Sequence, residues 1–290
     1  MSVSAWFQTF CDNLRMPDND VSNVRSRYKQ ITKRINLDYY NSSSETDHSL
    51  YVGSYGRGTA IHLSDVDIIV ELPSTTYKKF DDYSDNGQSS LLQEVRDVLK
   101  KTYSTSHISG NGQVVVISFA DGITFEVVPA FINKAGSYTY PDTNNGGSWK
   151  STNPKPEIAA ISSMNATTNK NLKRLCRMMR AWKDRRTVPL KGLLIDTLAY
   201  NFLQDWVHKD KSYLYYDLMT RDFLEYLSLQ TNKTYYFAPG SKERVYVTGA
   251  FSRQAAECLE IAEVGISKES DCPRTAKSKW REIYGTKFPS

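Results

Sequence analysis

The stretch GSYGRGTAIHLSDVDIIVEL, residues 53–72, is the part of the chain that most strongly indicates its fold. It opens with a glycine-rich turn and closes in the apolar run Ile68–Val70, which predicts a turn followed by a buried strand. Asp65 and Asp67 stand at the start of that strand. Side chains alternate between the two faces of a strand, so both carboxylates are expected to point the same way. Two carboxylates held close repel each other, and a hard divalent cation would relieve that repulsion.

The turn itself suits a phosphate. Gly53 lets the backbone approach a phosphate closely, while the hydroxyl of Ser54 and the neighbouring amide groups can donate hydrogen bonds to its oxygens. Arg57, which lies between Gly56 and Gly58, is a further candidate phosphate contact. The stretch contains neither a GK[ST] nor a G-x-G-x-x-G motif, so P-loop ATPases and dinucleotide-binding domains are excluded.

A third carboxylate follows in a predicted β-hairpin. The runs VVVISFA and ITFEVVPAF flank Asp121-Gly122, a pair that favours a type I′ turn because both central residues need positive φ. Glu126 lies in the second run between apolar neighbours. It is either an outward, solvated residue or a third ligand beside the two aspartates. Three such carboxylates would suit two-metal phosphoryl transfer, in which positioning and charge neutralisation do most of the chemistry.

The order of predicted elements indicates an α+β protein. We expect a mixed-sheet catalytic lobe with N-terminal helices over residues 1–150, and a helical lobe over residues 151–290. Residues 133–157 are expected to be irregular, with Tyr138 and Tyr140 either pinning a loop or stacking on a base. Helices are predicted where apolar residues recur at intervals of three and four, namely in residues 3–15, after Asp20, and in residues 88–103, 171–186, 190–207, 220–229 and 252–262.

Composition narrows the class of protein only a little. The 290 residues carry a formal charge of +5, which falls short of a dedicated duplex-DNA binder but suits a local polyphosphate pocket. No signal peptide and no membrane-spanning run is recognised, so we expect a cytoplasmic protein. The four cysteines are widely spaced, so free thiols are expected rather than a zinc site; they are Cys11, Cys176, Cys258 and Cys272.

The predicted helix 171–186 carries a basic stripe. Lys173, Arg177 and Arg180 recur at helical spacing on a side other than the apolar one. Such a stripe is either a solvated charged face or the counter-charge for a triphosphate. If it serves a triphosphate, Arg180 and Lys183 are the favoured contacts.

Several of these stretches resemble one family. Residues 53–72 look like the G-S…D-x-D signature of the DNA polymerase β-like nucleotidyltransferases. More narrowly, the chain resembles the bacterial cGAS/DncV-like enzymes, which carry the second-messenger oligonucleotide or dinucleotide synthetase domain, from about residue 20 to 289. FEVVPAF resembles their third-acid strand, NLKRLCRMMRAWKDRR followed by LKGLLIDTLAYNF their helical lobe, and KWREIYGTKFP their tail. The resemblance implies a bilobed polymerase-β-type fold.

Carried over residue by residue, the resemblance assigns roles. Asp65, Asp67 and Glu126 match the catalytic, metal-binding acids, with Mg²⁺, or Mn²⁺ in its place, as the cofactor. The chain departs from many relatives in having Lys191-Gly192 where they have Lys-Ser, and Arg180 where they have a lysine. The candidate substrate-binding residues are Gly53, Ser54, Arg57, Arg180, Lys183 and Lys191.

The resemblance also implies an activity and partners. The substrates would be nucleoside triphosphates (ATP, GTP or a pyrimidine nucleotide), joined into a cyclic di- or trinucleotide second messenger. In anti-phage defence such a diffusible product activates a separate effector, and neither a membrane nor a stable nucleic-acid partner is expected. Two alternatives stay open: a nucleotidyltransferase acting on RNA or a protein acceptor, and a catalytically degenerate nucleotide-binding sensor.

Overall fold

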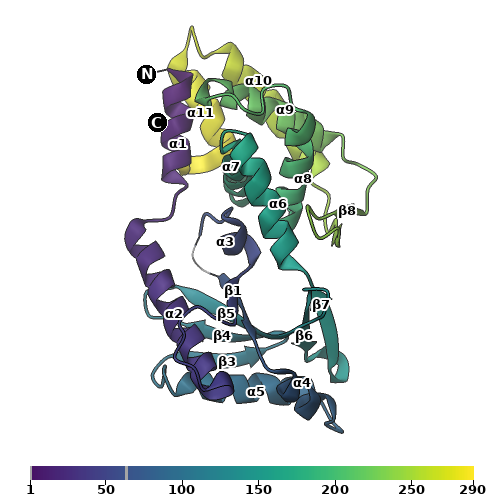
Figure 1. Ribbon diagram of the computed structural model, residues 1–290. Helices are drawn as coiled ribbons and strands as arrows, with labels where there is room; N and C mark the ends of the chain where they lie inside the picture. The colour runs from purple at the N-terminus through teal and green to yellow at the C-terminus, as the bar shows by residue number, and fades with distance from the viewer. Residues whose placement is uncertain (1, 63–64) are drawn as a thin grey trace. The chain divides into compact units, whose positions relative to one another are not determined.

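The computed structural model describes residues 2–62 and 65–290. The chain forms two compact units. The sheet unit consists of Met16–Gly56 and His62–Lys155, and the helical unit consists of Met1–Arg15, Arg57–Ile61 and Pro156–Ser290. One unit is built on a mixed sheet and the other on packed helices (Figure 1), which confirms the predicted α+β class.

The sheet unit has one seven-stranded mixed sheet with the central order β1-β2-β5-β4-β3, and β6 and β7 extend from β5. The strands are β1 (Ser49–Tyr51), β2 (Val66–Glu71), β3 (His107–Asn111), β4 (Val114–Ser118), β5 (Thr124–Ile132), β6 (Tyr138–Asp142) and β7 (Ser148–Thr152). The helices are α2 (Asp18–Tyr40), α3 (Gly53–Arg57), α4 (Ser74–Asp81) and α5 (Gly87–Lys100), with the 3-10 turn η1 (Asn144–Gly146).

Alternation along β2 separates the core from the candidate site. Val66, Ile68 and Val70 are fully buried and pack in one hydrophobic cluster with apolar residues of α2 and α5. Asp67 and Ile69 point to the other face because successive side chains alternate. The apolar even positions therefore fix the strand and leave Asp67 on the face that α2 and α5 do not cover.

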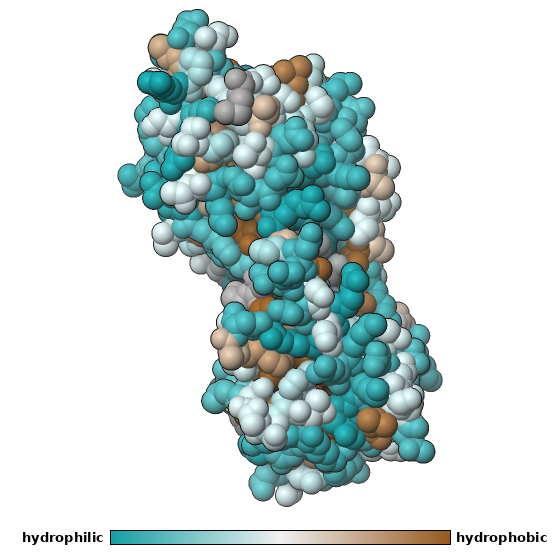
Figure 2. Space-filling model, turned by 90° about the vertical axis from the view of Figure 1, so that its left-hand side faces the viewer, coloured by the Kyte–Doolittle hydropathy of each residue, from teal (hydrophilic) through white to brown (hydrophobic). Residues whose placement is uncertain are grey.

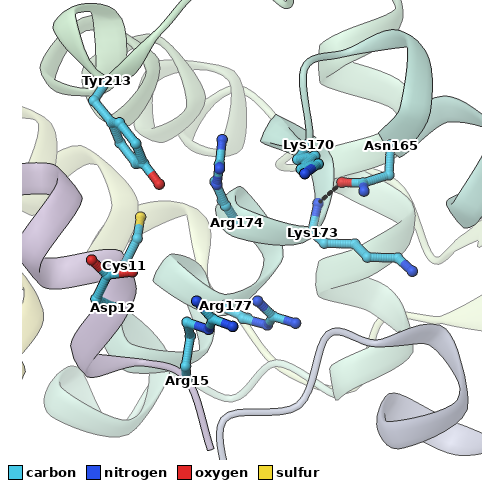
Figure 3. Close-up of a pocket in the computed structure, with 9 residues that line it drawn as sticks. All are labelled: Cys11, Asp12, Arg15, Asn165, Lys170, Lys173, Arg174, Arg177 and Tyr213. Carbon is cyan, nitrogen blue, oxygen red and sulfur yellow. Dashed lines mark hydrogen bonds between the residues drawn. The ribbon is translucent and has the colours of Figure 1, made fainter.

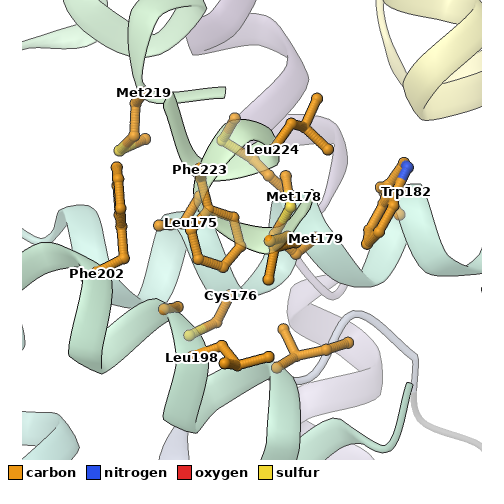
Figure 4. Close-up of a cluster of buried hydrophobic side chains, with 14 of the residues drawn as sticks. Leu175, Cys176, Met178, Met179, Trp182, Leu198, Phe202, Met219, Phe223 and Leu224 are labelled. Atoms are coloured by element: carbon orange, nitrogen blue, oxygen red, sulfur yellow. The ribbon is translucent and has the colours of Figure 1, made fainter. Parts of the chain in front are cut away.

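The helical unit is centred on α7. Its helices are α1 (Val3–Asn13), α6 (Pro154–Thr167), α7 (Asn171–Arg186), α8 (Gly192–Asp205), α9 (Tyr216–Ser228), α10 (Ser252–Ser267) and α11 (Pro273–Tyr284). A small hairpin of β8 (Tyr235–Phe237) and β9 (Arg244–Tyr246) and the 3-10 turns η2 (Tyr213–Tyr215) and η3 (Gly285–Lys287) complete it. Side chains of α7, α8 and α9 interlock in its core, among them Leu175, Met179, Leu198, Phe202 and Phe223 (Figure 4).

The N-terminal helix lies in the helical unit, whereas the sequence placed it with the catalytic lobe. The ring of Phe7 packs edge-on against Trp280 with 5.2 Å between centroids, and that of Phe10 lies 4.5 Å from Tyr284. These aromatic contacts bury the apolar face of α1 against α11, at the far end of the chain. Such long-range packing decides where an amphipathic helix docks, and local periodicity does not encode it.

The hairpin around Asp121 is present, but its predicted turn type is wrong. β4 and β5 pair antiparallel, and Phe119 and Ile123 close a three-residue loop through a 3.0 Å bond from Phe119 N to Ile123 O. Gly122 has φ of 85°, while Asp121 does not have positive φ. Three-residue loops place a glycine at the left-handed position, so the pair Asp-Gly is accommodated without a type I′ turn.

Residues 133–157 were expected to be irregular, and instead they form most of the β6–β7 hairpin and the start of α6. Tyr138 is fully buried, and its hydroxyl donates to Glu71 Oε1 at 2.5 Å. The ring therefore pins the hairpin to β2 and is not free to stack on a base. Tyr140, on the same strand, is partly buried.

The remaining features of the fold concern its hydrophobic helices, its surface and its cysteines. No helix in the described ranges is long and apolar enough to cross a bilayer. On the face drawn in Figure 2 hydrophilic residues predominate, and hydrophobic residues reach the surface only in small groups. All four cysteines are free thiols, and three of them are buried.

Candidate active site

The two strand-borne acids meet across a parallel strand pair. β2 and β5 run parallel with Asp67 directly opposite Glu126, so both side chains leave the sheet on the same face. Both residues are partly buried, while Asp65, one residue before β2, is exposed. Burial raises the pKa of Glu126, and the charges of Asp67 and Asp65 and a hydrogen bond with Asp67 raise it further. Asp67 and Asp65 therefore act on Glu126 as like charges.

Gly53 begins α3 against this acid pair. Its φ is 60°, and a Cβ built on it would lie 1.8 Å from Oδ2 of Asp67. The amide of Val52 donates to the carbonyl oxygen of Asp67 at 2.9 Å, which ties the start of α3 to β2. Both the backbone conformation and the contact exclude a side chain at position 53. Ser54 follows Gly53 in the sequence and is partly buried.

The acids fit a hard divalent cation by the chemistry of their donors. In the ranges that the structure describes, no three His, Cys, Asp or Glu side chains converge into a ready metal cluster. Asp67 and Glu126 nevertheless already pair across the strands. Carboxylate oxygens are the ligands that Mg²⁺ and Mn²⁺ prefer, and a bound cation would remove the repulsion between these groups.

Two of the predicted substrate-binding residues meet in the helical unit, on a buried carboxylate. Asp196, on α8, has no exposed surface and accepts from Nε of Arg57 at 2.8 Å. It also accepts from Nη1 and Nη2 of Arg180 at 2.6 and 3.0 Å, and from the hydroxyl of Thr59 at 2.9 Å. Burial acts to raise the pKa of Asp196, but the charges of Arg180 and Arg57 outweigh it and hold the pKa below its ordinary value.

The same network explains why position 192 is a glycine. Nη2 of Arg180 donates to the carbonyl oxygen of Gly192 at 3.1 Å, and a Cβ there would lie 3.1 Å from that same nitrogen. A serine here would press on the guanidinium of Arg180. Lys183 is partly exposed and Lys191 exposed, and neither belongs to this network.

Asp196 was not singled out from the sequence, although a signal was present. It is an acid inside the apolar helix LLIDTLAYNF, and a carboxylate in such a place needs a cationic partner. The partner Arg57 is 139 positions away, which no spacing rule reveals.

Comparisons with known proteins identify the family. A model of the Second Messenger Oligonucleotide or Dinucleotide Synthetase domain matches residues 1–165, more than half of the chain. No curated protein sequence matches the chain.

Solved structures share the fold at low sequence identity. CdnC of Escherichia coli MS115-1, solved with ATP, is 15% identical over 98% of both chains with a TM-score of 0.74. The CD-NTase CdnG of Bradyrhizobium diazoefficiens, in complex with GTP, is 12% identical over 98% of this chain and 95% of its own, with a TM-score of 0.68. The CdnE cyclic dinucleotide synthase of Elizabethkingia meningoseptica, with GTP and Apcpp, is 15% identical over 86% of this chain and 97% of its own, with a TM-score of 0.55.

These matches confirm both the polymerase-β-type fold and the family that the sequence motifs suggested. The chain belongs to the Second Messenger Oligonucleotide or Dinucleotide Synthetase domain family, the bacterial cGAS/DncV-like nucleotidyltransferases.

Proposed function

We propose that this protein joins ribonucleoside triphosphates into a cyclic di- or trinucleotide second messenger by two-metal nucleotidyl transfer. The observation that carries the proposal is the Asp67–Glu126 register on parallel strands, with the backbone of Gly53 packed against Asp67. Family membership supports the substrate class, and the similar structures of CdnC and CdnG hold ATP and GTP.

The acids would divide the chemistry between them. Asp65, Asp67 and Glu126 would hold Mg²⁺ or Mn²⁺, and such ions, when bound, neutralise phosphate charge and lower the pKa of a bound hydroxyl. A 2′- or 3′-hydroxyl attacks the α-phosphorus, and the bond to the pyrophosphate breaks. Glu126 would accept the hydroxyl proton, and a second attack of the same kind would close the ring.

The phosphate contacts would come from Gly53-Ser54 and from lysines of the helical unit. Ser54 and the adjoining amides would hold the β- and γ-phosphates, with Lys183 and Lys191 as exposed cations for the same charge. Arg57 and Arg180 would have to leave Asp196 to reach a phosphate. We assign them a positioning role within the helical unit instead, because both are held by the fully buried Asp196.

The proposed setting is signalling. The product would diffuse to a separate effector in anti-phage defence, in the cytoplasm, and no stable nucleic-acid partner is proposed. The rivals are transfer to RNA or to a protein acceptor, and nucleotide sensing without catalysis.

The test is incubation of the purified protein with labelled nucleoside triphosphates and Mg²⁺ alone. We expect phosphatase-resistant ring products, identified by mass spectrometry, and their loss in Asp67→Asn. Asp82→Asn, an exposed position at the end of α4, is the matched control and should retain activity. Product that forms only after RNA or a protein acceptor is added would overturn ring synthesis, and no turnover under any condition would favour the sensor.

A further inference from the structure

A cavity of about 320 Å³ in the helical unit is lined by far more positive than negative charge. Its wall comes from α1, Arg15 just beyond it, the end of α6, Lys170 just before α7, α7 and η2 (Figure 3). Of the described residues that line it, Asp12 carries the one carboxylate. The cations are Arg15, Lys170, Lys173, Arg174 and Arg177. None of these residues belongs to the candidate active site.

The cavity cations are held by neutral partners. Nη1 of Arg174 donates to Asn169 O at 3.0 Å and to the hydroxyl of Tyr216 at 3.2 Å, and Nη2 of Arg177 donates to Gly58 O at 2.8 Å. In the part of the chain that the structure describes, none of the five cavity cations forms an ion pair with a carboxylate. Arg174 and Arg177 are therefore held in place by neutral groups, and the positive charge of the five cations exceeds the negative charge of the wall.

Of the five cations, Arg177 gives the strongest indication of an anion site. Its Nε is buried and has no hydrogen-bond partner among the described residues. Burial lowers the pKa of Arg177, and Arg15 is among the like charges that lower it further. Burial likewise lowers the pKa of Lys173, and Arg177 adds to that effect. A buried donor without an acceptor and neighbouring like charges both cost stability, and an anion in the cavity would relieve both costs.

We propose that this cavity binds a small phosphate-bearing anion, at a site separate from the acids of the sheet unit. Guanidinium and ammonium groups are the side chains that bind phosphate oxygens best, and several around one cavity suit an oligophosphate with three or more charges. The walls enclose a volume at the lower end of small-ligand sites. A nucleic-acid backbone would need an extended basic track, which a net charge of +5 does not indicate.

The test measures binding of inorganic tripolyphosphate by calorimetry in EDTA. Excess chelator keeps metal-bridged phosphate out of the active site, whereas the cavity needs no metal. The double variant Arg15→Gln/Lys173→Gln removes two of the cavity cations, and Arg253→Gln/Lys268→Gln removes two exposed charges from the α10 region of the same unit. We expect at least about tenfold weaker binding in the cavity variant and a change of less than about twofold in the control.

Three results would overturn the proposal. Equal loss of tripolyphosphate binding in the cavity variant and in the control would mean that the anion is attracted by the overall charge of the surface. Loss of tripolyphosphate binding in Asp65→Asn/Asp67→Asn would mean that the anion binds at the acids. Tighter binding of a short oligonucleotide, also lost in the cavity variant, would mean a nucleic-acid surface. The outcome is independent of ring synthesis, because tripolyphosphate binding in EDTA and product formation from nucleotides are separate readouts.

Discussion

The two charge clusters described above differ in how their charge is balanced. In the helical unit the buried carboxylates of Asp196 and Glu157 pair with Arg57 and Arg180, so two negative charges balance two positive ones. Asp67 and Glu126 in the sheet unit are partly buried, and after burial the charge of Asp67 is the next cause that raises the pKa of Glu126. A balanced buried cluster is a structural element, whereas like charges held together on rigid strands indicate that a ligand of opposite charge is required.

The largest expected effect is on the balanced cluster. Asp196→Asn leaves two buried guanidinium groups without their carboxylate, and it should lower the free energy of unfolding by about 3–5 kcal/mol. Asp210→Asn, which alters an exposed ion pair with Lys211, should change it by less than about 1 kcal/mol. Chemical denaturation measures both. Equal stability of Asp196→Asn and wild type would show that the network is not structural.

A smaller effect is expected from Gly53→Ala, with Gly136→Ala as its matched control. Both glycines have positive φ, but a Cβ at 136 has nothing within 4 Å, whereas at 53 it meets Asp67 Oδ2. In the control the free energy of unfolding should fall only by the cost of holding an alanine in the left-handed backbone conformation, about 1–2 kcal/mol. Gly53→Ala should lose more than that and should also lose nucleotidyl transfer, because Asp67 must move. Equal losses in the two variants would contradict the close packing of α3 on the acid pair.

The last of the expected effects concerns pH. Burial and the charge of Asp217 raise the pKa of Glu269 from its ordinary value of 4.5 to about 8. The folded state therefore holds this proton more tightly than the unfolded state, and stability should fall as pH rises from about 4.5 through about 8.

Denaturation at several pH values checks this sign. In Glu269→Gln the slope over that range should flatten, and stability above pH 8 should rise relative to wild type. Glu263→Gln, an exposed position on α10, should keep the wild-type slope. An unchanged slope in Glu269→Gln would show that another group titrates.

Local patterns predicted the elements that carry the acids. The apolar run 68–70 and the alternation in ITFEVVPAF indicated β2 and β5, because burial on a sheet face is visible in each strand alone. The parallel register that sets Asp67 opposite Glu126 joins residues far apart, and neither strand encodes it. The resemblance to known nucleotidyltransferases, rather than strand periodicity, brought these acids together at the level of sequence.

What the sequence missed depends on distant partners. Tyr138 lies in a segment rich in turn-forming residues, and its burial depends on Glu71, 67 positions earlier. The docking of α1 depends on Trp280, and the burial of Arg57 depends on Asp196. In each case the position of the residue depends on a partner far away in the sequence.

The central claim is that Asp67 and Glu126 together hold the divalent ions of nucleotidyl transfer. The most direct test measures how many Mn²⁺ ions the protein binds when a non-hydrolysable nucleoside triphosphate is present. Electron paramagnetic resonance detects the free and the bound Mn²⁺. We expect two ions in the wild type and the loss of tight binding in Asp67→Asn and in Glu126→Gln, while Asp82→Asn binds as the wild type does. Unchanged Mn²⁺ binding in Asp67→Asn or in Glu126→Gln would contradict the account.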